Sequence, residues 1–172
     1  MARLGGGGTA VHLRPVTADN LGECLALRLA EPQAALVASN AKSLAEAKVN
    51  PSLVPLAIYD VAARGYERPA VPMVGFVMYE VTVGIGFVLR LMIDGSYQRR
   101  GYGRAAMVEV IRRLTLTPEV ELIATSHRHA NEAAARLFQG LGFVPWAIEW
   151  AKDNPDEVFL RLTEEAGGWP ER

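Results

Sequence analysis

The stretch Gln98-Arg99-Arg100-Gly101-Tyr102-Gly103-Arg104 organises this sequence. An apolar run at residues 87–94 precedes it, and apolar residues at helical spacing follow from residue 104 to residue 114. The order is therefore strand, loop and helix. Two glycines one residue apart allow the backbone a positive φ and leave no Cβ in the way of a ligand.

This loop predicts an anion site. The first N–H groups of the helix after it have no helical partners and lie at the positive end of the helix dipole, where a polyphosphate binds well. Three nearby arginines add donors for charge-assisted hydrogen bonds. The alternative is an ordinary helix start whose arginines face water.

Two other phosphate loops are alternatives for the same residues. Residues 101–106 also fit G-x-G-x-x-A, the dinucleotide fingerprint. However, residues 95–100 separate this pattern from its strand, and Glu121 would begin the next strand rather than end it. A nucleotide-dependent oxidoreductase therefore stays an alternative. A P-loop is excluded because no Gly-Lys-Ser/Thr follows.

Two motifs carry a resemblance to a known family. Gln98 to Gly103 resembles the Gln/Arg-x-x-Gly-x-Gly/Ala motif of the GCN5-related N-acetyltransferases. Residues 131–143 are similar to the second signature of that family, an Asn that opens a helix ending in a Gly-Phe turn. More loosely, residues 37–40 and 74–79 resemble the bacterial spermine/spermidine acetyltransferases. The resemblance covers nearly the whole chain, from about Val11 to Leu162.

The resemblance implies a single α/β (α+β) domain with a mixed, mostly antiparallel central sheet, splayed central strands and flanking helices. We expect this domain at residues 11–165, with tails at 1–10 and 166–172. Periodicity and turn residues predict the elements independently. Strands are expected at 11–16, 53–61, 72–81, 87–94, 120–126, 144–150 and 158–162, and helices after Thr17 or Asp19, at 33–48 with a break near Ser39-Asn40, at 103–116 and from Asn131 to about Leu141.

The resemblance also implies acetyl-CoA as cosubstrate and assigns residues to it. Backbone N–H groups of residues 99–104 would hold the pyrophosphate, and the backbone of residues 91–93 would pair with the pantetheine arm. The plain alternatives are core packing for residues 91–93, a helix cap for Asn131 and a solvated side chain for Arg136. The full expected cofactor set is Leu91, Met92, Ile93, Gln98, Arg99, Arg100, Gly101, Tyr102, Gly103, Arg104, Asn131 and Arg136.

The implied reaction is attack of a neutral amine on the thioester. A free alkylamine has a pKa of about 10.4, so a base must first remove a proton. Glu80 and Asp94 are the carboxylates nearest to the central strand in sequence, and both are candidates; Asp94 has the alternative role of a loop cap. The tyrosine acid of many family members corresponds to Phe138, which has no proton to give. An acyl-CoA sensor without turnover therefore stays an alternative.

Composition limits the partners. The 172 residues suit one domain, and a net charge of −1 gives no electrostatic reason to expect nucleic acid or an anionic membrane. The single cysteine, Cys24, cannot form an internal disulfide, so a reducing cytoplasm is expected.

No metal site is expected. The implied acceptor is a small primary amine, with a polyamine as one choice. Glu31 and Glu46 are candidates to face a cationic amine, and solvated surface carboxylates are the alternative. A homodimer through Trp146, Trp150 and Val158 is left open.

Overall fold

A computed structural model describes residues 8–61 and 72–163 of the chain. One sheet of seven strands, in the order β1-β2-β3-β4-β5-β7-β6, carries helices on both faces. The strands are β1 (Val11–Pro15), β2 (Leu53–Asp60), β3 (Met73–Thr82), β4 (Ile85–Ile93), β5 (Leu122–Arg128), β6 (Phe143–Pro145) and β7 (Glu157–Leu162). The helices are α1 (Leu21–Ala26), α2 (Asn40–Val49), α3 (Tyr102–Thr115) and α4 (Glu132–Gly140), with short 3-10 turns η1 (Gln33–Ala35), η3 (Gly95–Tyr97) and η4 (Glu149–Asp153).

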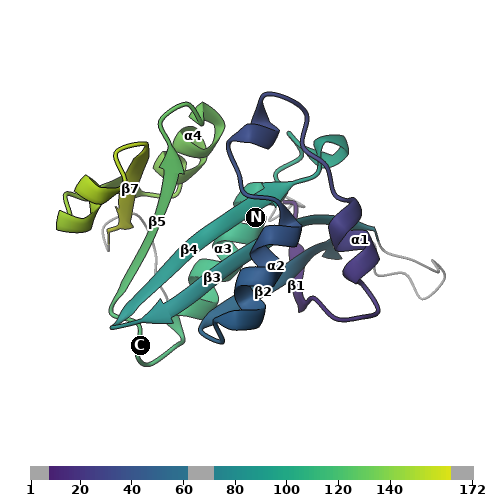
Figure 1. Ribbon diagram of the computed structural model, residues 1–172, viewed down its shortest axis with the longest axis horizontal. Helices are drawn as coiled ribbons and strands as arrows, with labels where there is room; N and C mark the ends of the chain where they lie inside the picture. Colours follow the sequence, from purple (N-terminus) through teal and green to yellow (C-terminus); the bar gives the residue numbers. More distant parts are fainter. Residues whose placement is uncertain (1–7, 62–71, 164–172) are drawn as a thin grey trace, which may run out of the picture.

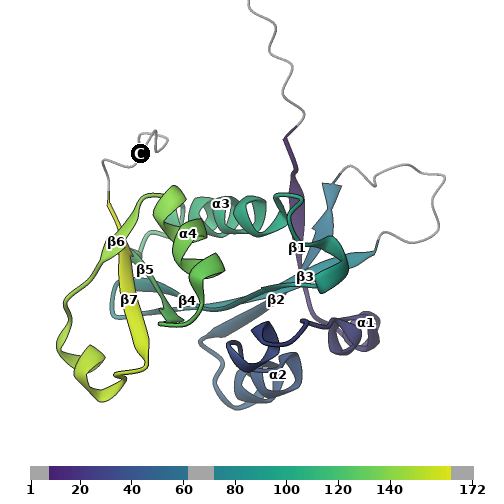
Figure 2. The ribbon, with the colours of Figure 1, turned by 90° about the horizontal axis from the view of Figure 1, so that it is seen from above.

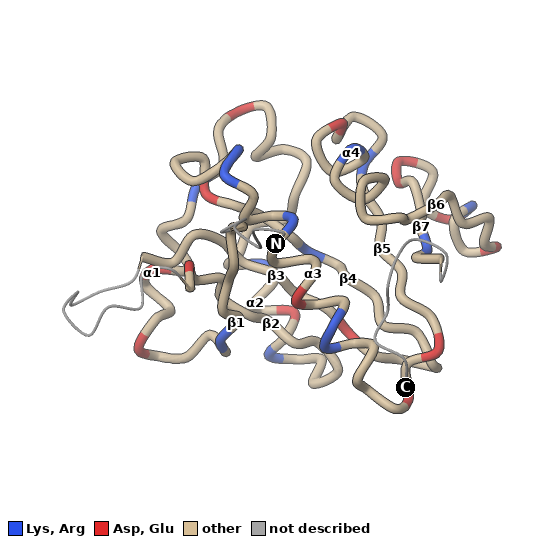
Figure 3. The backbone as a smooth tube through the Cα atoms, turned by 180° about the vertical axis from the view of Figure 1, so that it is seen from behind, with Lys and Arg blue, Asp and Glu red and all other residues tan. Residues whose placement is uncertain are grey.

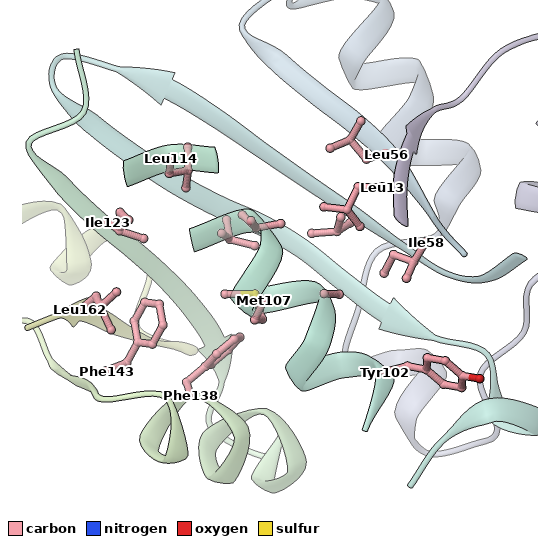
Figure 4. Close-up of a cluster of buried hydrophobic side chains, with 14 of the residues drawn as sticks. Leu13, Leu56, Ile58, Tyr102, Met107, Leu114, Ile123, Phe138, Phe143 and Leu162 are labelled. Carbon is pink, nitrogen blue, oxygen red and sulfur yellow. The ribbon is translucent and has the colours of Figure 1, made fainter. Parts of the chain in front are cut away.

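Each face of the sheet has its own core. Figure 2 shows α3 and α4 on one face and α1 and α2 on the other. Because successive strand residues point to opposite faces, β3 sends Val77 toward α3 and sends Phe76 and Met78 toward α1 and α2. On the α3 side, Met107 and Leu114 pack into the larger cluster that Figure 4 shows.

The central strands β4 and β5 pair over only part of their length. β4 runs antiparallel to β3 throughout, but it pairs in parallel with β5 only at Ile85–Val88 with Leu122–Thr125. On its other edge β5 pairs with β7 from Ala124 to Arg128, and Figure 1 shows β4 and β5 diverging. The predicted splayed strands and the mixed sheet are therefore confirmed.

A register shift lies at the same place on β4. Met78 pairs with Arg90 but Tyr79 pairs with Val88, so Leu89 is an extra residue without a partner opposite it on β3. Such a bulge re-aims the side chains around it. The divergence leaves residues 89–93 of β4 without a pairing partner on the β5 side, and the bulge against β3 lies at the start of this stretch.

The predicted helices and the first five predicted strands are confirmed to within a few residues. The expected break near Ser39 is present, because Ser39 caps α2 by accepting a hydrogen bond from the Lys42 N–H at 3.2 Å. The predicted strand at 144–150 is wrong beyond Pro145. Residues 149–153 form η4 instead, because the Trp150 ring packs on Phe159, with ring centroids 4.9 Å apart. The tail at 166–172 and most of the tail at 1–10 lie outside the described residues.

Candidate active site

The loop between β4 and α3 presents free backbone N–H groups. Gly101 has a φ of 86° and caps α3, and the first helical hydrogen bond runs from the Ala105 N–H to the Gly101 carbonyl at 3.0 Å. The N–H groups of residues 102–104 precede that bond. In the part of the chain that the structure describes, no side chain caps this helix start. The geometry is that of an anion-binding helix N-terminus.

A cavity of about 450 Å³ opens in front of these N–H groups, between β4 and α4. Of the residues expected to bind the cofactor, all but Arg100 and Arg104 line it. The lining includes Leu91, Met92, Ile93, Gln98, Arg99, Gly101, Tyr102, Gly103, Asn131 and Arg136. Residues that are 45 positions apart in sequence (91 and 136) thus meet around one space. We call it the cofactor cavity.

The two expected residues outside the cofactor cavity have other neighbours. The guanidinium of Arg100 lies over the ring of Tyr97, 5.7 Å from its centroid. Arg104 lies on the other side of the helix start, in a groove that Thr9 also lines. Inside the cavity, the exposed side chain of Arg136 forms an ion pair with Glu132 at 3.5 Å.

Asp94 and Gln98 attach this loop to the segment before α2. The carboxylate of Asp94 accepts hydrogen bonds from the N–H groups of Arg28 at 2.8 Å and Ser96 at 2.9 Å. Burial raises the pKa of Asp94, but these hydrogen bonds outweigh it and hold the pKa below its usual value. The amide of Gln98 donates to the Ile93 carbonyl at 3.0 Å and to the Gln33 side chain at 2.7 Å.

Tyr102 anchors the first turn of α3. Its hydroxyl donates a short hydrogen bond to the carboxylate of Asp60, at the end of β2, and its ring packs edge-on against Tyr97 with centroids 6.3 Å apart. The hydrogen bond to Asp60, with burial, raises the pKa of Tyr102. The helix start that carries the free N–H groups is therefore fixed to the sheet.

A second cavity, of about 260 Å³, lies in the opening between β4 and β5. It is lined by the segment leading into α2, by β4, β5 and α4, and by the first residue of β7. Val37, Leu91, Asn131 and Ala134 line both this space and the cofactor cavity, so the two cavities meet at these residues. We call the second space the acceptor cavity.

Asn131 serves as a helix cap at this junction. Its Oδ1 accepts a hydrogen bond from the Ala134 N–H at 3.1 Å at the start of α4. The cap that sequence reasoning gave as the alternative is therefore present. The side-chain Nδ2 has no hydrogen-bond partner within the described ranges, and it stays available as a donor to a ligand.

The ionisable groups of the acceptor cavity differ from those expected. Glu157 lines it and accepts a short hydrogen bond from the hydroxyl of Ser126. Lys42, Arg90 and Arg128 also line it. Sequence reasoning missed Glu157 because its place depends on the pairing of β7 with β5, which sets Glu157 opposite Arg128.

The two expected catalytic carboxylates line neither of these cavities. Glu80 lies near the far end of β3, where it pairs with Leu53 and Phe87. Asp94 is engaged in the hydrogen bonds described above. A catalytic role for either residue stays a prediction that the geometry does not support.

Phe138 lines the acceptor cavity with a side chain that carries no proton donor. It is 4 % exposed and packs against Phe143 and His127, with ring centroids 5.6 Å and 6.3 Å apart. The expectation of a core phenylalanine is compatible with this burial. A family acid at this position is absent from the sequence itself.

The comparisons with known proteins agree with this geometry. Residues 46–143, more than half of the chain, match the model of the acetyltransferase (GNAT) family. The chain belongs to the acetyltransferase (GNAT) family. It is accordingly an N-acetyltransferase that uses acetyl-CoA as cosubstrate.

This acetyltransferase is similar in sequence to one curated enzyme and in fold to two solved structures. The spermine/spermidine N(1)-acetyltransferase of Bacillus subtilis (strain 168) is 28% identical over 142 residues, covering 78% of this chain and 88% of its own. An acetyltransferase from Thermus thermophilus has a TM-score of 0.65 at 18% identity, with coverage of 88% and 96%. The PaiA N-acetyltransferase of Thermoplasma acidophilum, solved with coenzyme A, has a TM-score of 0.60 at 9% identity, with coverage of 89% and 98%.

The described residues contain neither a membrane-spanning helix nor a cluster of metal ligands. Among the helices that the structure describes, none has the length and apolar character needed to cross a membrane. Within residues 8–61 and 72–163, no group of three or more His, Cys, Asp or Glu side chains is placed to hold a metal ion.

Proposed function

We propose that this acetyltransferase transfers the acetyl group at the junction of its two cavities. The observation that carries the proposal is that Val37, Leu91, Asn131 and Ala134 line both spaces. A thioester in the cofactor cavity and an amine in the acceptor cavity would meet there. Bringing the two reactants together in this way supplies much of the catalysis that acyl transfer needs.

The cofactor cavity suits acetyl-CoA in two respects. The free N–H groups of residues 102–104 would bind the pyrophosphate, with Arg99 beside them. Residues 91–93 of β4 have no β5 neighbour, so their backbone would pair with the amide-rich pantetheine arm. A backbone N–H of this strand would also stabilise the negative charge that develops on the thioester oxygen.

We propose Glu157 as the base, acting through Ser126. The amine arrives as an ammonium ion and must lose a proton before it attacks. The Glu157 carboxylate would accept this proton, directly or through the Ser126 hydroxyl that donates to it. The C–N bond then forms and the C–S bond breaks. The attacking nitrogen passes its second proton to water or to the leaving thiolate, and Glu157 returns the first proton to solvent. Phe138 is therefore no obstacle to turnover.

The identity of the acceptor is a separate question. The names of the two Bacillus subtilis relatives suggest a polyamine. Figure 3 shows Lys and Arg interspersed with Asp and Glu over the chain, which supports a small molecule rather than a nucleic acid as partner. Cytoplasmic location stays a prediction, and so does a homodimer. Trp146 and Trp150, two of the residues offered for a dimer contact, already pack on each other within the chain, with ring centroids 5.7 Å apart.

Thiol release tests the proposal directly. The purified chain is incubated with acetyl-CoA and a panel of polyamines, amino acids and aminoglycosides, and calorimetry compares coenzyme A with NAD. We expect coenzyme A to bind and at least one amine to release it. Binding of coenzyme A without any acceptor would favour the sensor alternative, and binding of NAD alone would favour the oxidoreductase.

The Glu157→Gln variant tests the proposed base. We expect kcat to fall by about a hundredfold or more, the usual effect of losing a general base, with the loss largest at low pH. Glu149→Gln is the matched control, because Glu149 is an exposed carboxylate of η4 paired with Lys152 at 2.6 Å. Equal kcat values for the Glu157→Gln variant and the parent would remove Glu157 from the mechanism.

A further inference from the structure

The acceptor cavity carries cationic groups from more than one wall. Lys42 comes from α2, Arg90 from β4 and Arg128 from the end of β5. Among its lining residues only Glu157 is a carboxylate, and Ser126 already donates to it. A polyamine carries several ammonium groups, so all but one of them would face a wall without a negative charge.

Glu46 does not correct this balance. The sequence made Glu46 a candidate to bind a cationic substrate. In the structure its carboxylate already forms ion pairs with the Arg90 guanidinium at 3.2 Å and the Lys42 ammonium at 3.9 Å. Two cations share one carboxylate, so the Lys42 and Arg90 side of the cavity keeps a positive charge. An added ammonium group would compete with both for Glu46, whereas an anion would complete the pairing.

Arg90 is placed to meet such an anion. The bulge at Leu89 precedes it, and its terminal nitrogen donates to the Leu89 carbonyl at 3.1 Å, which holds the guanidinium at the cavity wall. Its side chain is 21% exposed. Its Nε is buried and has no hydrogen-bond partner within residues 8–61 and 72–163. A buried donor without a partner is costly, and an anionic ligand can satisfy it.

From these observations we propose that the acceptor is a zwitterionic amine, one that carries a carboxylate or a phosphate beside the amine. The inference rests on the proposed function of the acceptor cavity. The ammonium group faces Glu157 and Ser126, and the anion faces Arg90 and Lys42. Because Arg90 and Glu157 line the same cavity of about 260 Å³, a small molecule can reach both with its two charges.

Matched pairs of acceptors test the class. Lysine is compared with cadaverine, ornithine with putrescine and O-phosphoethanolamine with ethanolamine; the last pair separates a phosphate from a carboxylate. Spermidine is included as the polyamine. We expect kcat/KM to be at least about tenfold higher for the anionic member of a pair, the size expected for a charge-assisted hydrogen bond. Higher kcat/KM for spermidine than for every zwitterion would overturn the proposal.

Two variants test which residues set the preference for the anionic acceptor of each pair. Arg90→Gln is expected to bring the kcat/KM ratio of each pair close to one, and this ratio is insensitive to the amount of folded protein. Glu46→Gln releases Arg90 and Lys42 and is expected to raise the ratio, whereas a polyamine site that used Glu46 would lose activity. Lys152→Gln, at the exposed Lys152–Glu149 pair, is the control and should leave the ratio unchanged.

A binding measurement separates this inference from the proposed function. Lysine and cadaverine are titrated into the complex of the full chain with coenzyme A. Lysine binding that Arg90→Gln abolishes supports the inference even where no acceptor turns over. Turnover of polyamines alone would support the proposed function and overturn the inference. A parent protein that binds neither amine would overturn it as well.

Discussion

The hydroxyl of Thr125 donates a 2.9 Å hydrogen bond to the carbonyl of Val88 at the last pair of residues that joins β4 to β5. Both residues are buried, with 1% and 2% of their surface exposed. A side chain therefore satisfies the strand carbonyl at the position where the backbone ladder ends. The opening that holds the acceptor cavity begins at this bond.

Replacing this hydroxyl by a methyl group should destabilise the fold. Thr125→Val keeps the shape of the side chain but leaves the buried Val88 carbonyl without its partner, at a cost of about 1–3 kcal/mol. Urea unfolding measures the change. Thr115→Val is the control, because the Thr115 hydroxyl bonds the Ile111 carbonyl within α3, and about 0.5 kcal/mol or less is expected there. Similar losses in both variants would contradict a special role for Thr125.

A side chain at Gly103 should block the cofactor without disturbing the fold. An added Cβ would lie 3.7 Å from Leu137 and 3.8 Å from Ile93, which are ordinary contacts at the wall of the cofactor cavity. We expect Gly103→Val to weaken coenzyme A binding by more than about tenfold, or about 1.4 kcal/mol, in calorimetry.

Gly140→Val is the control for that change. An added Cβ at Gly140 has no atom within 4 Å, and Gly140 ends α4 away from both cavities. We expect its coenzyme A affinity to equal that of the parent. Unchanged affinity of Gly103→Val would mean that the pyrophosphate binds elsewhere.

Cys24 should make stability depend on pH in the alkaline range. Burial raises the pKa of its thiol from 9.0 to about 11. The folded chain therefore holds the thiol proton more tightly than the unfolded chain does. Stability from this group is complete below about pH 9 and declines as the pH rises toward 11, by roughly 2 kcal/mol at the upper end.

Unfolding of the parent and of Cys24→Ala between pH 8 and pH 11 measures this effect. The variant loses some stability at every pH through lost packing, but its slope in this window should be shallower. The Tyr102 phenol, whose pKa is also raised, contributes equally to both proteins and cancels in the difference. Parallel slopes would show that the thiol ionises freely in the folded chain.

Tyr102 should matter for both stability and cofactor binding. Tyr102→Phe keeps the packed ring and removes the hydrogen bond to Asp60, at a cost of about 1–2 kcal/mol. Because this bond fixes the first turn of α3, coenzyme A affinity should fall with it. Tyr79→Phe is the control, since the Tyr79 hydroxyl has no partner in the described part of the chain. A variant that loses stability but keeps full affinity would separate the two roles.

Local patterns predicted which residues lie together around the cofactor cavity, and their role in binding stays a prediction. Residues 91–104 run continuously from the end of β4 through the loop into α3, so they are close together because they are close in sequence. Residues 131–136 begin α4, which lines the same cavity. The acceptor side depends on pairing between distant strands. The position of the Glu157 side chain depends on the register between β5 and β7. The position of the Arg90 side chain depends on a β-bulge that no sequence pattern predicts. Nearness in sequence to the central strand made Glu80 a candidate catalytic base, but Glu80 lies near the far end of β3 and lines neither cavity.

The hydrogen bonds of Asp94 with Arg28 and of Gln98 with Gln33 tie the phosphate loop to the segment that leads to Val37, at the wall shared by the two cavities. We therefore expect that binding of one reactant at that loop orders the wall that the other reactant contacts. Initial-rate kinetics should show a compulsory sequence of addition, with the thioester loading before the amine and free coenzyme A competing only with the former.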